Sequence, residues 1–300
     1  MKTIKLALSL PFLFVQSVYY WLRARRKALP GKLFYPYGLG MGLRLLTKGV
    51  FSPKLFLNPV SIVRYFEFDF VRKCLDEQKK GGLLLDVASP FLIGFYLAER
   101  KQQHVHYINP DHKDLTEVTK KARALSIDPV FQTDGYDATQ LPFENEQFDN
   151  IISVSVIEHV VQNGDSQVMK ELWRVLKPGG NLILTFPVKT KFEEEYREAD
   201  VYGLQGSSEQ GRYFFQRFYD EQALNQRLLG QLDGAEIVQS RVFGESDNNF
   251  YEPYSKRWMK RHYFETVKDP YYIARHFRYF DTIGQLPGLG VMGLQIRKPI

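Results

Sequence analysis

The sequence predicts an α/β fold in which a doubly wound, mostly parallel sheet carries helices on both faces. Short apolar runs alternate with amphipathic helical patterns from residue 81 onward, and glycine or proline commonly separates them. Hydrophobic residues make up 44% of the 300-residue chain, which is enough for a substantial core. In such folds the ligands lie beyond the carboxyl ends of the strands.

Each element follows from its local pattern. The run GGLLLDV has the composition of a buried parallel strand, and the segment after it begins a helix with Ser89 as cap and Pro90 in the first turn. The other expected strands lie at residues 105–108, 130–133, 148–156, 181–188, 235–243 and 290–297. Helices are expected at residues 90–100, 113–125 and 166–176.

The N-terminal segment has a different composition. Residues 1–66 contain eleven Lys or Arg and no Asp or Glu, although the whole chain nets only +6. Residues 6–22 are uncharged, and a basic cluster follows them. We expect residues 1–32 to form an arm that lies on a membrane or dips through it, at the cytoplasmic face. A helix packed on the body or on a second copy is an alternative, as is a cleaved signal peptide, although no small-residue cleavage site is visible.

Residues 33–80 are expected to form a helical connector, with irregular structure rich in Gly, Pro and aromatics near its start. Cys74 is the only cysteine, so no intrachain disulfide can form and a reducing, cytoplasmic compartment is expected. No residues have metal-ligand spacing, so no metal is expected. Nucleic acid is not an expected partner, because its binding surfaces rarely need such a long uncharged run. The sequence does not indicate an oligomeric state.

A family resemblance rests on residues 133–188. Asp137-Ala138 is followed by Leu141-Pro142-Phe143, then by Phe148-Asp149 opening a strand, and by Lys177-Pro178-Gly179-Gly180 before the strand NLILTFPV. This order resembles class I S-adenosylmethionine-dependent methyltransferases of the small-molecule type. The resemblance implies a seven-stranded sheet with an antiparallel C-terminal strand, and S-adenosylmethionine as cofactor. The methyltransferase domain would span residues 81–300, with lid insertions at about 189–220 and 245–288.

The resemblance also implies a cofactor site at three strand ends. At the first, Asp86 precedes a loop in which the three expected glycines are replaced by Ala88, Pro90 and Leu92. A helix N-terminus and the Ser89 hydroxyl would still be present there. The alternative is that Asp86 caps a turn and binds no ligand.

At the second strand end, Asn109 stands where the family carries the acid that binds the ribose, and Asp111 follows two residues later. The alternative for Asp111 is a helix cap. At the third, Asp137 would bind the adenine amino group and the Ala138 backbone would contact the ring. Asp137 could instead be an ordinary polar loop residue.

His159 follows the fourth strand and is the candidate general base, because its unperturbed pKa lies near neutrality. The alternative is a structural histidine, hydrogen-bonded at the strand end. We expect methyl transfer to a small-molecule or glycan acceptor, as O-methylation. One alternative is methylation of a lipid or quinone at the membrane. Another is a non-catalytic binding or scaffold protein that keeps the fold, since the glycines are missing.

Overall fold

The computed structural model describes residues 2–76, 81–200, 203, 211–247 and 250–300, with the backbone alone for residues 2–8, 259 and 261. The chain divides into two compact units. The first comprises residues 1–70, 243–279 and 287–289, and the second comprises residues 71–242, 280–286 and 290–300. Parts of both expected lid insertions, residues 201–202, 204–210 and 248–249, lie outside the described residues.

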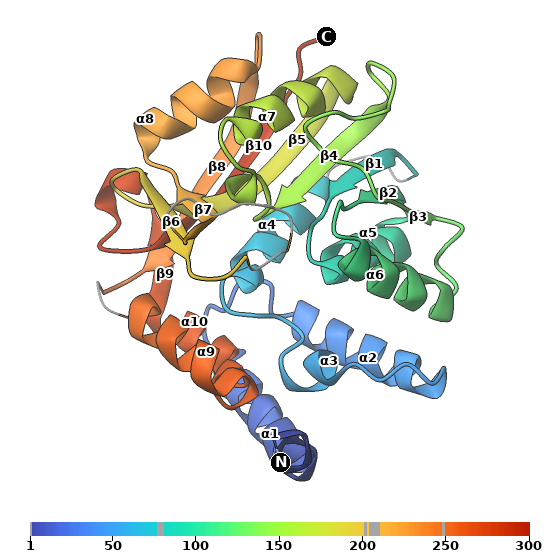
Figure 1. Ribbon diagram of the computed structural model, residues 1–300, viewed down its shortest axis with the longest axis vertical. Coiled ribbons are helices and arrows are strands. Elements are labelled where there is room, and N and C mark those ends of the chain that lie inside the picture. The colour runs from blue at the N-terminus through green and yellow to red at the C-terminus, as the bar shows by residue number, and fades with distance from the viewer. Residues whose placement is uncertain (1, 77–80, 201–202, 204–210, 248–249) are drawn as a thin grey trace. The chain divides into compact units, whose positions relative to one another are not determined.

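A mixed sheet, most of whose residues belong to the second unit, confirms the predicted fold class (Figure 1). Within the described residues the sheet has eight strands in the order β3-β2-β1-β4-β5-β10-β8-β9, one strand more than predicted. Strands β3, β2, β1, β4 and β5 pair in parallel, and β10 runs antiparallel to β5. The bounds are β1 Leu83–Val87, β2 His104–Ile108, β3 Phe131–Asp134, β4 Phe148–Val154, β5 Leu176–Val188, β8 Glu236–Glu245, β9 Phe277–Phe280 and β10 Gly290–Arg297.

Helices cover both faces of the parallel strands, because right-handed crossovers lead in one direction from β1 to β3 and in the other from β4 to β5. Figure 1 shows α5 (Phe91–Lys101) and α6 (His112–Ala124) on one side of the sheet and α7 (Gly164–Val175) on the other. The apolar residues of α7 pack against the sheet in one hydrophobic core. Leu224 and Leu228 belong to the same core, and they lie in the segment formed by α8 (Glu221–Ala223), η2 (Leu224–Leu228) and η3 (Leu229–Gln231). This packing fixes the positions of the strand ends where the site was predicted.

Two local expectations need correction. The helix α5 begins after Pro90, and no side chain caps it, so Ser89 is not its cap. The segment Lys177-Pro178-Gly179-Gly180 does not lie between elements but within β5, where it forms a bulge opposite Asp149. A Cβ on Gly180 would lie 2.8 Å from the Asp149 carbonyl oxygen, which explains glycine there.

A two-stranded hairpin was not predicted. It consists of β6 (Glu193–Arg197) and β7 (Tyr213–Phe218), and its strands pair in antiparallel fashion. A single parallel bridge between Val188 and Tyr219 continues β7 alongside the end of β5. The 3-10 turn η1 (Ile157–His159), which follows β4, packs against β7. The hairpin therefore lies at the carboxyl ends of β4 and β5.

The first unit is largely helical. It contains α1 (Lys2–Ala24), α2 (Phe34–Thr47), α3 (Pro53–Leu57), the start of α4 (Arg64–Asp76), α9 (Tyr251–Thr266) and α10 (Asp269–His276). One side of α1 packs against Leu57 and Val267 through Leu13, and Ser17 contributes a 2.6 Å hydrogen bond with the Tyr35 hydroxyl. Among the described residues, no helix combines the length and apolar composition that a membrane crossing requires.

A buried carboxylate joins three segments of this unit. Asp269, at the start of α10, is fully buried. Its Oδ2 accepts hydrogen bonds from the Asn58 side chain at 3.0 Å and the Ile62 amide at 3.1 Å. Its Oδ1 accepts the Tyr254 hydroxyl at 2.7 Å. Both oxygens are thus satisfied, and burial still raises the pKa of Asp269 to about 8.

Candidate functional site

The loop after β1 keeps a glycine-like backbone without glycine. Ala88 has a φ of +48°, in the left-handed region that disfavours residues with a Cβ. Its amide donates a 2.8 Å hydrogen bond to the Ile108 carbonyl at the end of β2, which holds the turn against the sheet. The chain therefore follows the path that glycine would allow, at a cost in backbone strain.

Asp86 and Ser89 hold this loop from behind. Both are essentially buried, at 0% and 1% exposure. Asp86 Oδ1 accepts the Ser89 amide at 3.1 Å, and the Ser89 hydroxyl accepts the Val154 amide of β4 at 3.2 Å. Burial raises the pKa of Asp86 to about 7, and hydrogen bonds from Ser89 oppose part of this shift. These two side chains shape the turn and do not present themselves at its surface.

Two bulky residues, Phe91 and Leu92, follow this loop at the start of α5. The Phe91 ring lies 5.4 Å from the Phe95 ring and beneath the Lys121 ammonium of α6, at 5.5 Å. Phe91 thus packs between α5 and α6. Leu92 is buried, at 3% exposure. The Phe91 ring is therefore accommodated in the helical layer, and Leu92, which stands at one of the glycine positions, is buried.

At the end of β2, the predicted ribose residues are occupied by local bonds. The Asn109 amide nitrogen donates to the Tyr107 hydroxyl at 3.1 Å and to Asp114 at 2.9 Å, and its oxygen accepts the Asp111 amide. Asp111 caps α6 by accepting the Lys113 and Asp114 amides. The geometry gives Asp111 the capping role that was its alternative, and Asn109 has only an acceptor left to offer.

At the end of β3, the Asp137 side chain is exposed. Its Oδ1 accepts both the amide and the hydroxyl of Thr139, each at 2.8 Å, which folds the segment into a tight turn. In the described part of the chain no donor reaches Oδ2. Ala138 is half-buried and packs on the core. Among the predicted cofactor residues, Asp137 is therefore the one whose side chain is fixed by hydrogen bonds and also exposed to a ligand.

The Leu141-Pro142-Phe143 segment is fixed by a pair that the sequence did not single out. Arg174 of α7 donates to the Phe143 carbonyl at 2.8 Å and the Leu141 carbonyl at 3.0 Å. Glu171, one turn earlier, accepts the Leu141 amide at 2.8 Å and pairs with Arg174. The Glu-x-x-Arg spacing before Leu-Lys-Pro-Gly-Gly was the available signal. The pair keeps the turn that carries Asp137 in register with α7.

His159 lies in η1, half-buried, beside the hairpin. Its Nδ1 is 2.6 Å from the Phe215 carbonyl oxygen. A carbonyl only accepts, so Nδ1 carries the hydrogen and Nε2 of the neutral ring is left as the acceptor. Nε2 lies 3.7 Å from Glu158 Oε1. The geometry is compatible with both interpretations of His159, as a structural residue and as a general base. The hydrogen bond to Phe215 orients the imidazole ring at the strand end, and Nε2 can take a proton.

A buried charge cluster anchors the segment that follows His159. Arg217 of β7 is only 1% exposed, and it donates to the carbonyls of Val160 and Gln162. Asp165, at the start of α7, accepts Arg227 at 2.7 Å and the Tyr219 hydroxyl at 3.0 Å. These residues were missed because the sequence shows only an aromatic cluster with arginines. The contacts tie the hairpin to the end of β4.

Backbone strain concentrates at the same edge of the sheet. Ala88, Ser155 and Gln162 have φ values of +48°, +49° and +54° and follow β1, β4 and η1. The other non-glycine residues with positive φ in the described part of the chain, Gln102, Ser126 and Glu146, end helices or form a turn. Gln162 also lies in a turn, which leads into α7, so Ala88 and Ser155 are the strained residues here that neither a cap nor a turn explains. Strained residues of this kind are typical of functional sites.

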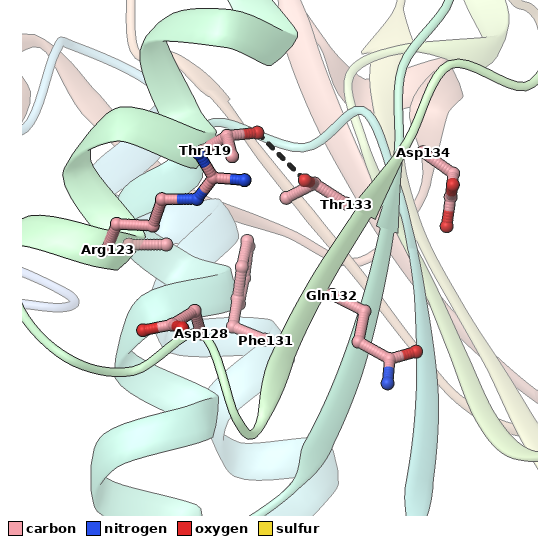
Figure 2. A pocket seen from close by; sticks show the side chains of 8 residues that line it. Thr119, Arg123, Asp128, Phe131, Gln132, Thr133 and Asp134 are labelled. Carbon is pink, nitrogen blue, oxygen red and sulfur yellow. Dashed lines mark hydrogen bonds between the residues drawn. The ribbon is translucent and has the colours of Figure 1, made fainter.

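A separate hollow of about 330 Å³ lies beside the outer strand β3. Figure 2 shows the Thr119 and Thr133 hydroxyls hydrogen-bonded across it, at 2.8 Å, while Gln132 and Asp134 point away on the other side of the strand. None of the predicted site residues lines it. This hollow is distinct from the strand-end site.

Comparison with known proteins identifies the fold and a methyltransferase domain within the chain. A family model described as "Methyltransferase domain" matches residues 86–184, a span that contains all eight predicted site residues. Residues 86–184 therefore form a methyltransferase domain, and the fold is that of the class I S-adenosylmethionine-dependent methyltransferase family. S-adenosylmethionine is the cofactor of this family, and the strained but intact β1 turn together with the accessible Asp137 fits it.

Curated relatives match part of the methyltransferase chain. It is 32% identical over 133 residues to "Probable tRNA methyltransferase 9B" of Homo sapiens and 30% identical over 135 residues to the protein of that name in Mus musculus. Each match covers 44% of this chain and 27% of the relative. The chain thus spans about a quarter of the length of these relatives.

Solved structures share the fold at low identity. Phosphoethanolamine N-methyltransferase 2 of Haemonchus contortus, in complex with S-adenosyl-L-methionine, has a TM-score of 0.50 at 14% identity, covering 78% of this chain and 52% of that one. Coclaurine N-methyltransferase has a TM-score of 0.52 at 10% identity, covering 77% and 69%. The cyclase SpnF has a TM-score of 0.53 at 20% identity, covering 78% and 80%.

Proposed function

We propose that the protein transfers a methyl group from S-adenosylmethionine to the oxygen of a small-molecule or glycan acceptor. The observation that carries the proposal is the accessible Asp137, held by Thr139 in a turn that α7 locks in place. Asp137 would hold the adenine amino group, and the turn at Ala88 would approach the amino-acid end beside the start of α5. When bound, S-adenosylmethionine supplies an electrophilic methyl group.

His159 acts as the general base in this proposal. The Phe215 carbonyl fixes the ring and leaves Nε2 as the acceptor, so the proton of an acceptor hydroxyl passes to Nε2 as its oxygen is alkylated. Phe215 also places an aromatic ring 5.1 Å from the imidazole ring. We propose that the hairpin covers the acceptor side of the site and limits the entry of water.

The test is label transfer from methyl-labelled cofactor, with His159→Gln as the variant. Loss of a general base lowers turnover by about 10²- to 10⁴-fold, whereas the control His104→Gln, at an exposed position of β2, leaves turnover unchanged. Equal turnover in both variants would remove His159 from the mechanism. Cofactor binding, measured in parallel, separates a lost base from a lost fold.

The acceptor class is tested in the same assay. Soluble metabolites, glycans, a lipid and quinone extract, and bulk tRNA are offered separately. The proposal expects label in the soluble small molecules or glycans. Label in the lipid arm would support the membrane alternative. The tRNA arm is included because the curated relatives carry that name. Label there would overturn both our acceptor proposal and the expectation that nucleic acid is not a partner.

A non-catalytic binding protein is a second candidate function. It is favoured by the replaced glycines and by the fully occupied Asn109 amide nitrogen. This candidate expects no label in any acceptor arm while the protein still folds. A cofactor affinity in the micromolar range together with labelled product would exclude it.

We also propose that the enzyme works at the cytoplasmic face of a membrane. The absence of acidic residues from residues 1–66, against eleven basic ones, supports attraction to anionic lipid. Fractionation of cells that produce the full chain tests this location. Recovery in the membrane pellet at low salt, with release at high salt, is expected; recovery wholly in the supernatant would contradict it.

A further inference from the structure

We propose that the outer face of α1 binds an anionic lipid surface and that the helix lies in the plane of that surface. The outer face consists of Phe12, Val15, Tyr19 and Leu22, followed by the basic cluster Arg23, Arg25, Arg26 and Lys27. This inference rests on the proposed membrane location and adds the residues and the mode of binding.

Two faces of α1 differ sharply in burial. The inner face packs within its own unit through Leu13, Ser17 and Ala24, which are at most 1% exposed. On the outer face Phe12 is 61%, Val15 65%, Tyr19 49% and Leu22 38% exposed. Their spacing of three, four and three residues places them on one side of the helix. Four exposed apolar side chains in one stripe indicate a partner surface and not scattered exposure.

The charges that continue the stripe point to the chemistry of that partner. The guanidinium of Arg23 lies 5.8 Å from the Tyr19 ring centre and that of Arg25 lies 5.0 Å from the Trp21 ring centre. Arg26 and Lys27 are exposed. Aromatic rings beside cations suit the boundary between acyl chains and anionic head groups. The apolar stripe followed by this cluster matches an anionic lipid surface.

A second copy of the chain fits the face less well. Residues 1–66 hold eleven basic residues and no acidic one, so two copies joined through this segment would bring like charges together. An anionic bilayer supplies the opposite charge. Among the described residues no helix is both long and apolar enough to cross a bilayer, and binding in the plane of the surface does not require this.

Binding of the full-length protein to vesicles tests the inference. The probes are vesicles of phosphatidylcholine alone and of phosphatidylcholine with phosphatidylserine, compared by flotation. The wild type should bind the anionic vesicles and not the neutral ones. The double variant Phe12→Ser/Val15→Ser should bind at least about tenfold more weakly, because both side chains are exposed in the free protein and would enter the acyl region.

Two further variants sharpen the result. Arg25→Gln/Arg26→Gln/Lys27→Gln should lose the preference for anionic vesicles while keeping its fold. The matched control is Ile237→Ser/Val238→Ser on β8, which removes two other exposed apolar side chains, 51% and 38% exposed, and should bind like the wild type. Circular dichroism confirms folding, and cofactor titration confirms that the site is unaffected.

The outcomes separate the two proposals. No binding of wild type to anionic vesicles overturns both the face and the membrane location. Wild-type binding that Phe12→Ser/Val15→Ser leaves unchanged overturns only the face. A wild-type dimer that this variant dissociates, without vesicle binding, would show that the face joins two copies, and would overturn the proposal.

Discussion

Asp269 in the first unit and Asp86 in the second are both fully buried, but their hydrogen-bond environments differ. In the first unit Asp269 accepts three hydrogen bonds that cover both oxygens. In the second unit Asp86 Oδ1 is bonded to Ser89, whereas Oδ2 has no hydrogen-bond partner among the described residues. The first carboxylate joins three segments of a core. The second lies behind a strained turn at the predicted cofactor site, where incomplete satisfaction is typical of functional sites.

Removal of the two carboxylates should show this difference most strongly. Asp269→Ala leaves two side-chain donors and one amide buried without an acceptor, and should lower the free energy of unfolding by about 3 to 5 kcal/mol. Asp86→Ala orphans fewer donors and should cost about 1 to 2 kcal/mol. Urea unfolding followed by circular dichroism measures both. An Asp86 variant that is the less stable of the two would reverse the comparison.

The space beside Asp86 gives a second test, with an open position on α2 as its control. A Cβ on Gly94 of α5 would lie 2.5 Å from Asp86 Oδ2 and 3.0 Å from the Phe131 ring. Gly94→Ala should therefore destabilise the protein by about 1 to 3 kcal/mol. A Cβ on Gly40 of α2 would meet no atom within 4 Å. Gly40→Ala should stabilise by about 0.5 to 1 kcal/mol, as glycine-to-alanine changes in open helices do. Equal melting temperatures would contradict the contact with Asp86.

Both carboxylates should make stability fall as pH rises. Burial raises the pKa of Asp86 to about 7 and that of Asp269 to about 8, from an ordinary value of 3.8. The folded state then binds more protons than the unfolded state above pH 4, so the stabilising contribution is complete below that pH. It is lost as pH rises through the folded pKa, at up to about 1.4 kcal/mol per pH unit for each group.

The variants Asp86→Asn and Asp269→Asn check this assignment. Each should flatten the pH dependence of the free energy of unfolding between about pH 4 and the pKa of the residue removed. Between pH 7 and 8 only Asp269→Asn should change the slope of the free energy of unfolding against pH, because the pKa of Asp86 is lower than that of Asp269. Slopes in both variants that match the wild type would show that neither carboxylate is protonated in the folded state.

Relief of strain should give the smallest effect. Ala88→Gly removes a Cβ from a left-handed backbone position, which relieves strain in the folded state, whereas the greater freedom of glycine favours the unfolded chain. The net result should be a rise of about 0.5 kcal/mol in the free energy of unfolding. Gln102→Gly, at the left-handed C-cap of α5, should give a similar gain. Only the first change should alter cofactor affinity, because only Ala88 lies in the site. A change in affinity for Gln102→Gly would contradict that.

The sheet was predictable because its strands repeat a strong local pattern. The run ending at Val87 and the strand Gly290–Arg297 are apolar and bounded by turn residues. The hairpin was missed because Glu193–Arg197 carries three glutamates and little β propensity, so its pairing depends on β7. The extra strand β9 was assigned to an insertion for a different reason: it has only four residues, although three of them are aromatic and favour strands.

The site was predictable only as far as the strand ends. The chain order places Asp86, Asn109, Asp137 and His159 after β-strands or at their ends, and parallel strands bring those ends to one edge. The direction of each side chain depends on residues elsewhere. Asn109 turns to Asp114, Asp111 caps α6, and Arg217 becomes buried because the carbonyls of Val160 and Gln162 meet it from 57 and 55 residues away.

The central claim is that this strained turn and Asp137 still hold the cofactor without the usual glycines. Calorimetric titration of the full-length protein with S-adenosylhomocysteine tests it most directly. We predict micromolar binding that weakens by at least about tenfold in Asp137→Ala and is unchanged in Asp128→Ala, an exposed aspartate away from the site. A wild-type protein that gives no binding heat at millimolar ligand would contradict the account.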